Sequence, residues 1–77
     1  MSIKDAVIID YTNYRGERRK RVIIPHGLIF GSTDWHPKPQ WLLSAEDVEK
    51  EEIRHFAMKD IHSWEAATKA KVEELES

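Results

Sequence analysis

The sequence contains no cysteine and no long apolar run. Without cysteine the chain has neither disulfides nor thiolate zinc ligands, and nothing favours an oxidising compartment. The longest apolar runs are residues 6–9 and 22–25, far short of the roughly 20 residues that span a bilayer, and the start lacks the apolar segment of a signal peptide. We therefore expect a cytoplasmic protein that does not associate with a membrane.

The length of 77 residues allows one domain. A domain of this size buries only about 60% of the surface that its unfolded chain exposes, so its stability is modest. We expect a ligand or self-association to add stability, and we predict a homo-oligomer, most simply a dimer.

The formal net charge of −2 hides a segregation of charge along the chain. Residues 46–52 and 65–76 are rich in acid, whereas five cations fall within residues 15–21: Arg15, Arg18, Arg19, Lys20 and Arg21. Screening limits the reach of each charge to about 8 Å, so a local basic patch can attract phosphate on an acidic protein. The alternative is a solvated hairpin tip.

The pattern of apolar, β-branched and turn residues predicts five strands and a final helix. Gly16 supplies a turn, Pro25 ends the second strand, and residues 31–39 form a loop. The predicted strands cover residues 4–14, 18–24, 28–30, 40–46 and 53–58. Ser63 is a suitable N-cap for a helix over residues 64–75, whose Trp64 docks on the strands.

Five short strands with one flanking helix are best buried by curling the sheet into a partly closed barrel. The predicted fold is mainly β, a small five-stranded antiparallel barrel with one C-terminal α-helix. We assign the barrel domain to residues 4–62 and the helix and tail to residues 63–77.

Several short segments in fixed order resemble the WYL domain, a ligand-sensing module of bacterial transcription regulators. They are Ile9-Asp10-Tyr11, Gly16-Glu17, Arg21-Val22-Ile23-Ile24-Pro25, Trp41-Leu42-Leu43-Ser44-Ala45 and Arg54-His55-Phe56-Ala57-Met58. The resemblance covers about residues 6–61 and implies a barrel of five antiparallel strands similar to the Sm fold.

The resemblance also carries expectations about context. The family's regulators usually place a winged helix-turn-helix before this domain, and only a few residues precede the first predicted strand here. We therefore expect a free-standing sensor or adaptor of the kind encoded in prophages and compact bacterial operons.

The chain departs from the family at one residue of the triplet that gives the family its name. Leu42 replaces the tyrosine of that triplet. Since Trp41 and Leu43 share the opposite face of an alternating strand, we expect this change to alter the ligand site and to spare the core.

Arg21 and Arg54 match arginines that the family associates with nucleic acid or nucleotide-like ligands. A guanidinium presents a planar fork of donors that suits phosphate, so two of them on neighbouring strands predict an anion clamp. The alternative is a pair of structural arginines that bridge Asp10, Asp47 or Glu46. If they form a clamp, we expect charge reversal at both to abolish binding and to leave the fold intact.

Five further residues are candidates for the same ligand. His26 at the bend after Pro25 donates either to the ligand or to a backbone carbonyl. The hairpin cations Arg15 and Arg19 add positive charge. Most aromatic side chains are expected in the core, but Tyr14 and Trp35 lie at loop ends and are placed for stacking on bases.

The remaining histidines, His36, His55 and His62, lack the spacing of a helical metal motif, and no nucleophile, base and orienting group can be assembled. We therefore predict no metal, no cofactor and no enzymatic activity. A small hydrolase or metal enzyme stays an alternative only because loops can hide a site that spacing does not reveal, and two other functions are favoured. The first is a regulatory module that binds single-stranded nucleic acid or a nucleotide signal, and the second is a protein-interaction or oligomerisation module that uses an edge strand or the C-terminal helix.

Overall fold

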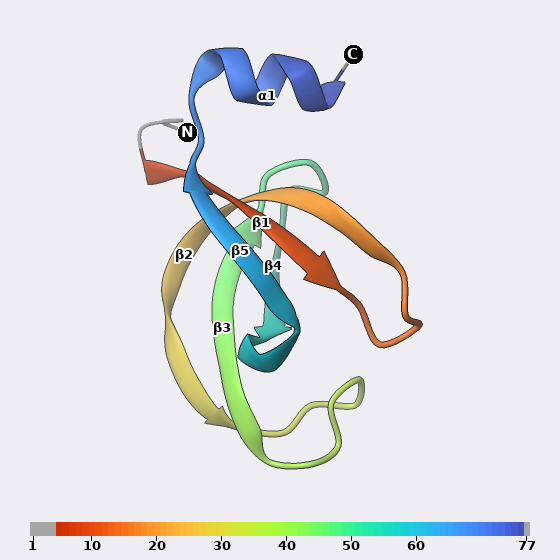
Figure 1. Cartoon of the computed structure of the whole chain (residues 1–77). Helices are drawn as coiled ribbons and strands as arrows, with labels where there is room; N and C mark the ends of the chain where they lie inside the picture. Colours follow the sequence, from red (N-terminus) through yellow and green to blue (C-terminus); the bar gives the residue numbers. More distant parts are fainter. Residues whose placement is uncertain (1–4, 77) are drawn as a thin grey trace.

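The computed structural model of the chain describes residues 5–76 and shows five antiparallel strands in one sheet, followed by one helix (Figure 1). The strands are β1 (Val7–Thr12), β2 (Arg18–Gly31), β3 (Gln40–Asp47), β4 (Glu52–Ala57) and β5 (Ile61–Ala66). A 3-10 turn, η2 (Met58–Asp60), precedes β5, and α1 spans Lys69–Glu76. Among the described residues, no helix has the length and apolar character needed to cross a bilayer.

The strand order is β4-β3-β2-β1-β5, so β4 and β5 lie at the two edges of the sheet. No ladder joins these two strands in the part of the chain that the structure describes. Figure 1 shows that the sheet is strongly curved. The structure thus confirms a mainly β fold with a C-terminal helix, but it shows an open curved sheet where the sequence predicts a barrel.

The β1–β2 turn forms as predicted at Gly16, whose φ of 81° lies in the left-handed region that glycine adopts without strain. The side chain of Asn13 fixes this turn, because its Oδ1 accepts hydrogen bonds from the backbone N–H groups of Arg15 at 2.9 Å and Glu17 at 3.0 Å. The turn therefore carries its own polar support at the base of the hairpin.

The prediction that Pro25 ends the second strand is wrong. β2 continues through Pro25 to Gly31, because a bulge lies between Pro25 and Gly27. Pro25 is paired with Ala45 and Gly27 with Ser44, which leaves His26 as the extra residue. A bulge tolerates the missing N–H of proline, so the segment predicted as a separate third strand is the second half of β2.

The prediction of a helix from Trp64 is also wrong. Trp64 lies on β5 in register with Ile9 of β1, and the helix begins only at Lys69. The Oγ1 of Thr68, rather than Ser63, accepts a hydrogen bond from a backbone N–H of the first turn, that of Lys71, at 3.2 Å. Pairing with the open edge of β1 outweighs the helix propensity of residues 64–67, and the boundary drawn between residues 62 and 63 falls within β5. Residues 4 and 77 lie outside the described residues.

The core lies on both faces of β1, as its alternating side chains require. On the inner face of the curve, six buried side chains form one cluster: Ile9, Tyr11, Ile23, Leu43, Ala45 and Phe56. On the outer face, Ala6, Ile8 and Ala67 form a second cluster, on which Val72 of α1 packs. Because α1 contributes only this thin contact, the inner cluster holds the strands that carry the site.

Candidate functional site

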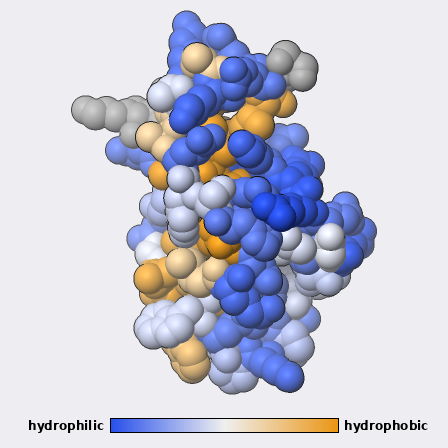
Figure 2. All heavy atoms as spheres, in the orientation of Figure 1, coloured by the Kyte–Doolittle hydropathy of each residue, from blue (hydrophilic) through white to orange (hydrophobic). Residues whose placement is uncertain are grey.

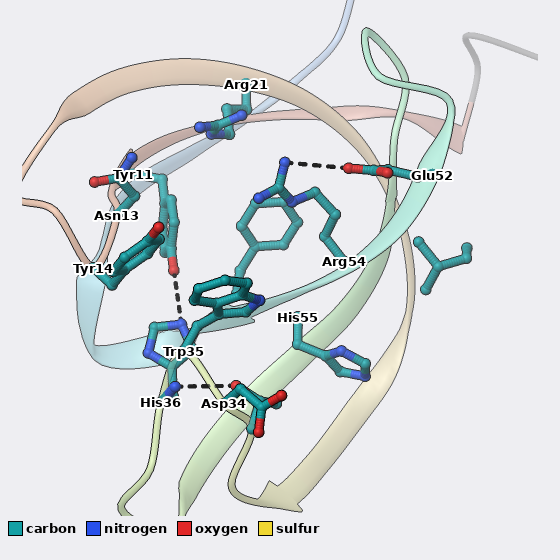
Figure 3. A pocket seen from close by; sticks show the side chains of 13 residues that line it. Tyr11, Asn13, Tyr14, Arg21, Asp34, Trp35, His36, Glu52, Arg54 and His55 are labelled. Carbon is teal, nitrogen blue, oxygen red and sulfur yellow. Dashed lines mark hydrogen bonds and ion pairs between the residues drawn. The ribbon is translucent and has the colours of Figure 1, made fainter.

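A pocket of about 450 Å³ opens at the mouth of the curved sheet (Figure 3). Its walls come from the end of β1 and the following turn, from β2, from the loop 32–39 and from β4. Four of the seven side chains predicted for a ligand site line it: Tyr14, Arg21, Trp35 and Arg54. His26, Arg15 and Arg19 do not belong to its walls.

The two arginines come from strands that are not neighbours. Arg21 lies on β2 and Arg54 on β4, and β3 lies between these strands in the sheet. The expectation of a clamp on neighbouring strands is therefore wrong in that detail. The curvature of the sheet, rather than direct strand pairing, places both guanidinium groups at the same pocket.

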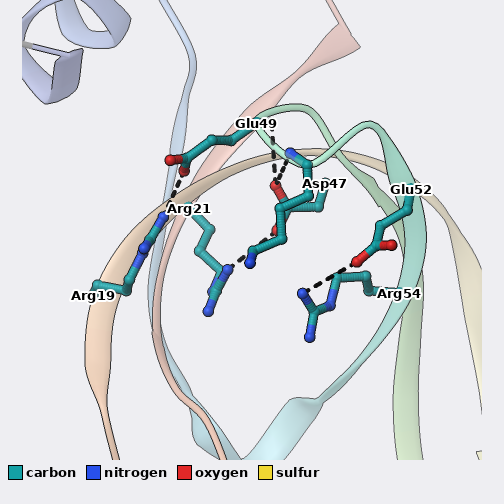
Figure 4. Close-up of polar contacts among 7 residues, drawn as sticks. Arg19, Arg21, Asp47, Glu49, Glu52 and Arg54 are labelled. Carbon is teal, nitrogen blue, oxygen red and sulfur yellow. Dashed lines mark hydrogen bonds and ion pairs between the residues drawn. The ribbon is translucent and has the colours of Figure 1, made fainter.

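Arg21 is held in a buried ion pair. Its Nη1 lies 3.2 Å from Oδ2 of Asp47, and the two side chains are only 9% and 1% exposed (Figure 4). Asp47 also accepts hydrogen bonds at Oδ1 from the backbone N–H groups of Glu49 and Lys50, at 3.1 and 3.3 Å. The structure thus shows the Asp47 bridge that was the alternative to a clamp. Arg21 nevertheless lines the pocket, and its buried Nε has no hydrogen-bond partner.

Arg54 is held more loosely. Its Nη1 lies 3.4 Å from Oε1 of Glu52, and the Glu52 side chain is more than half exposed. Exposed ion pairs of this kind contribute at most about 1 kcal/mol. Arg54 can therefore exchange Glu52 for an anion at small cost, whereas Arg21 cannot leave Asp47.

Two exposed aromatic rings lie at the rim of the pocket. Tyr14 and Trp35 are stacked with centroids 5.1 Å apart, and they remain 50% and 61% exposed. Arg15 contacts the Tyr14 ring, with its guanidinium carbon 5.5 Å from the ring centre and its Nε donating to the Tyr14 hydroxyl at 3.0 Å. Arg15 thus orients the aromatic pair without lining the pocket itself.

Tyr11 and His36 form the floor of the pocket, and the sequence analysis did not select either as a ligand residue. The Tyr11 hydroxyl accepts a hydrogen bond from the backbone N–H of Ala57 at 3.3 Å and lies 3.4 Å from Nε2 of His36. Burial raises the pKa of the Tyr11 hydroxyl, so it stays protonated at neutral pH and has a proton to offer to His36 or to a ligand. The β1 alternation that buries Ile9 and Tyr11 was the available signal for Tyr11.

The basic stretch of the β1–β2 hairpin is largely neutralised by acids. Arg18 forms a bidentate ion pair with Asp10, and Arg19 pairs with Glu49. The Nζ of Lys20 lies 3.9 Å from Oε1 of Glu65. Arg19 and Lys20 also line a separate groove beneath α1. His26 lies at the bulge of β2 and is exposed. The segregated cations of the sequence thus do not make one unpaired basic surface.

The Asp10–Arg18 pair predicts a specific acid sensitivity. The hydrogen bond from Arg18 lowers the pKa of Asp10, and the same bond raises the pKa of Arg18. Because the folded-state pKa of Asp10 is below its unfolded value of about 3.9, the pair stabilises the fold above that pH and loses its contribution as the pH falls through the folded-state pKa. Asp10→Asn should therefore lower the Tm at neutral pH. At a pH below the folded-state pKa of Asp10, the Tm of the variant should be closer to that of the wild-type protein. A parallel melting series for Glu17→Gln is the control, and equal curves for Asp10→Asn and wild type at every pH would contradict the assignment.

Leu42 lies in the core rather than in the pocket. It is fully buried, in register with Ile29 on one side and Ala57 on the other, and it does not line the pocket. Leu42 is therefore not one of the residues that form the pocket walls, and its effect on the ligand site stays a prediction.

Among the side chains that the structure describes, no three of histidine, cysteine, aspartate or glutamate gather as metal ligands. A comparison with curated proteins finds no match. The family model of the WYL domain matches residues 2–66 of the chain, which is most of its length and includes every residue that lines the pocket. The chain belongs to the WYL domain family.

Proposed function

We propose that this WYL domain is a non-enzymatic regulatory module that binds a phosphate-bearing ligand, either single-stranded nucleic acid or a nucleotide, in the pocket between β1, the loop 32–39 and β4. The observation that carries the proposal is the pairing of guanidinium groups with an exposed aromatic stack. Arg21 and Arg54 line the pocket together with Tyr14 and Trp35. A guanidinium group binds phosphate and an aromatic ring stacks on a nucleobase, so a site for a nucleotide needs both kinds of group close together.

The three polar features of the pocket take separate roles in this proposal. Arg54 exchanges its exposed pair with Glu52 for a direct bond to phosphate. Arg21 stays with Asp47 and supplies a fixed hydrogen-bonding surface at the back of the pocket. The exposed Tyr14–Trp35 pair receives a base. Binding then occurs with no covalent step.

The aromatic role has its own test in Trp35→Ala. Stacking of a base on an aromatic side chain contributes about 1–3 kcal/mol, so we expect the affinity for an oligothymidine of about six nucleotides to fall by roughly 5- to 150-fold. The slope of log affinity against log salt should stay as in wild type, because no charge is removed. Fluorescence anisotropy of a labelled oligothymidine measures both quantities.

Trp41→Ala is the matched control for this experiment. Trp41 is about as exposed as Trp35 but does not line the pocket, so its removal should leave the affinity within about twofold of wild type. Equal losses in the two variants would place the binding surface outside the pocket and contradict the proposal.

A further inference from the structure

The second half of β2 has an open side. β1 pairs with β2 only from Arg18 to Ile23, whereas β3 pairs with it as far as Gly31. From Pro25 to Gly31, no strand of the described chain lies against the side of β2 that faces away from β3. In an antiparallel ladder, alternate residues direct their backbone N–H and C=O groups to opposite sides, so this segment presents unpaired ladder groups. We call residues 25–31 the free edge of β2.

The free edge is apolar, exposed and uncharged. Leu28, Ile29 and Phe30 are 56%, 43% and 61% exposed, and the Phe30 ring lies edge-on to that of Trp41 across the ladder, with centroids 5.4 Å apart. Residues 22–33 contain no aspartate, glutamate, lysine or arginine, although 34% of the chain is charged. Figure 2 shows apolar surface on the left side of the lower half of the molecule, where Figure 1 places the end of β2.

The distribution of charge along β2 is the reverse of what protects a sheet edge. Monomeric proteins place lysine and other charged residues on open edges to prevent pairing with a second chain. In β2, the four cations Arg18 to Arg21 lie where β1 already covers the strand, and the uncharged half is open. A strand of this composition meets no like-charge repulsion when it lies against a copy of itself.

We propose that a second copy of this chain pairs with the free edge of β2, antiparallel and about a two-fold axis, so that the two sheets join into one. Such an interface uses the same patch on both copies and closes at two subunits. Pro25 and the adjacent bulge limit the paired stretch to about six residues, or roughly 20 Å. The pocket contains none of residues 25–31, so the dimer leaves it open and the inference does not depend on the proposed ligand.

Sedimentation velocity of the full chain over a range of concentrations tests the dimer. The wild-type protein should dimerise, and Phe30→Lys should weaken the dimer by at least about tenfold, because the two-fold axis brings both new charges to the interface. Leu75→Lys makes the same exchange at an exposed apolar residue of α1 and should leave the dimer unchanged. A wild-type monomer at all concentrations, or a dimer indifferent to Phe30→Lys, would overturn the proposal.

Backbone amide hydrogen exchange of the wild-type chain is a second test of the dimer, and it needs no variant. Raising the protein concentration should slow exchange at alternate amides within residues 26–31 and leave the amides of α1 unaffected. Slow exchange in this segment that does not depend on concentration would mean that the chain covers the edge itself, and it would also overturn the proposal.

Discussion

Replacing Asp47 by alanine is expected to lower the free energy of unfolding by about 3–5 kcal/mol. The variant leaves the guanidinium of Arg21 buried without its counter-charge, and it removes the acceptor for the backbone N–H groups of Glu49 and Lys50 in the β3–β4 turn. In a domain of 77 residues, such a loss is a large part of the total stability. Urea unfolding followed by tryptophan fluorescence measures it.

Glu49→Ala is the matched control for Asp47→Ala. Glu49 also pairs with an arginine of β2, Arg19, but both side chains are exposed, so we expect a loss of no more than about 1 kcal/mol. Similar losses for the two variants would show that burial does not strengthen the Arg21–Asp47 pair.

The burial of Arg21 against Asp47 also revises the expectation that charge reversal at both Arg21 and Arg54 leaves the fold intact. Arg21→Glu places a second carboxylate against buried Asp47 and should unfold the domain, so only Arg54 offers a clean test of binding.

Arg54→Glu is expected to weaken binding of an oligothymidine of about six nucleotides by about 10- to 100-fold. Charge-assisted hydrogen bonds contribute about 1.5–3 kcal/mol, and each 1.4 kcal/mol corresponds to a factor of ten in affinity. Arg54 lines the pocket and is partly exposed, so its replacement should leave the circular dichroism spectrum and the Tm close to those of wild type. Anisotropy titrations at fixed salt give the affinities.

Arg19→Glu changes the net charge by the same amount and is the control for general electrostatics. Arg19 lies outside the pocket and pairs with an exposed glutamate, so we expect its reversal to weaken binding by less than about threefold. If Arg19→Glu and Arg54→Glu weakened binding equally, the ligand would be held by the overall field of the hairpin and not by the pocket.

The elements predicted correctly from the sequence are those specified by local pattern. The alternation of Ile9 and Tyr11 identifies β1, and Gly16 marks the turn that follows it. The elements predicted wrongly depend on distant partners. Trp64 has neighbours of good helix propensity, yet the open edge of β1 pairs it with Ile9 in β5. Likewise Pro25 is a reliable strand terminator only where no bulge accommodates it.

The same division applies to the candidate site. Arg21, Arg54, Tyr14 and Trp35 were selected from the sequence, and the structure places all four at one pocket. The sequence could not show which acid each arginine meets, because Asp47 lies 26 residues from Arg21 and is brought to it by the β2–β3 ladder. It also could not show that Leu42 is enclosed, since the burial of a strand residue depends on what covers the sheet.

The central claim, that the pocket binds a phosphate-bearing ligand, is tested most directly by an NMR titration of the labelled protein with the oligothymidine and, separately, with a cyclic nucleotide. We predict shifts at the indole N–H of Trp35, at the Arg54 side chain and at Tyr14, with an affinity that falls as salt is raised. Absence of shifts with both probes, or shifts confined to residues 15–20 of the hairpin, would contradict the account.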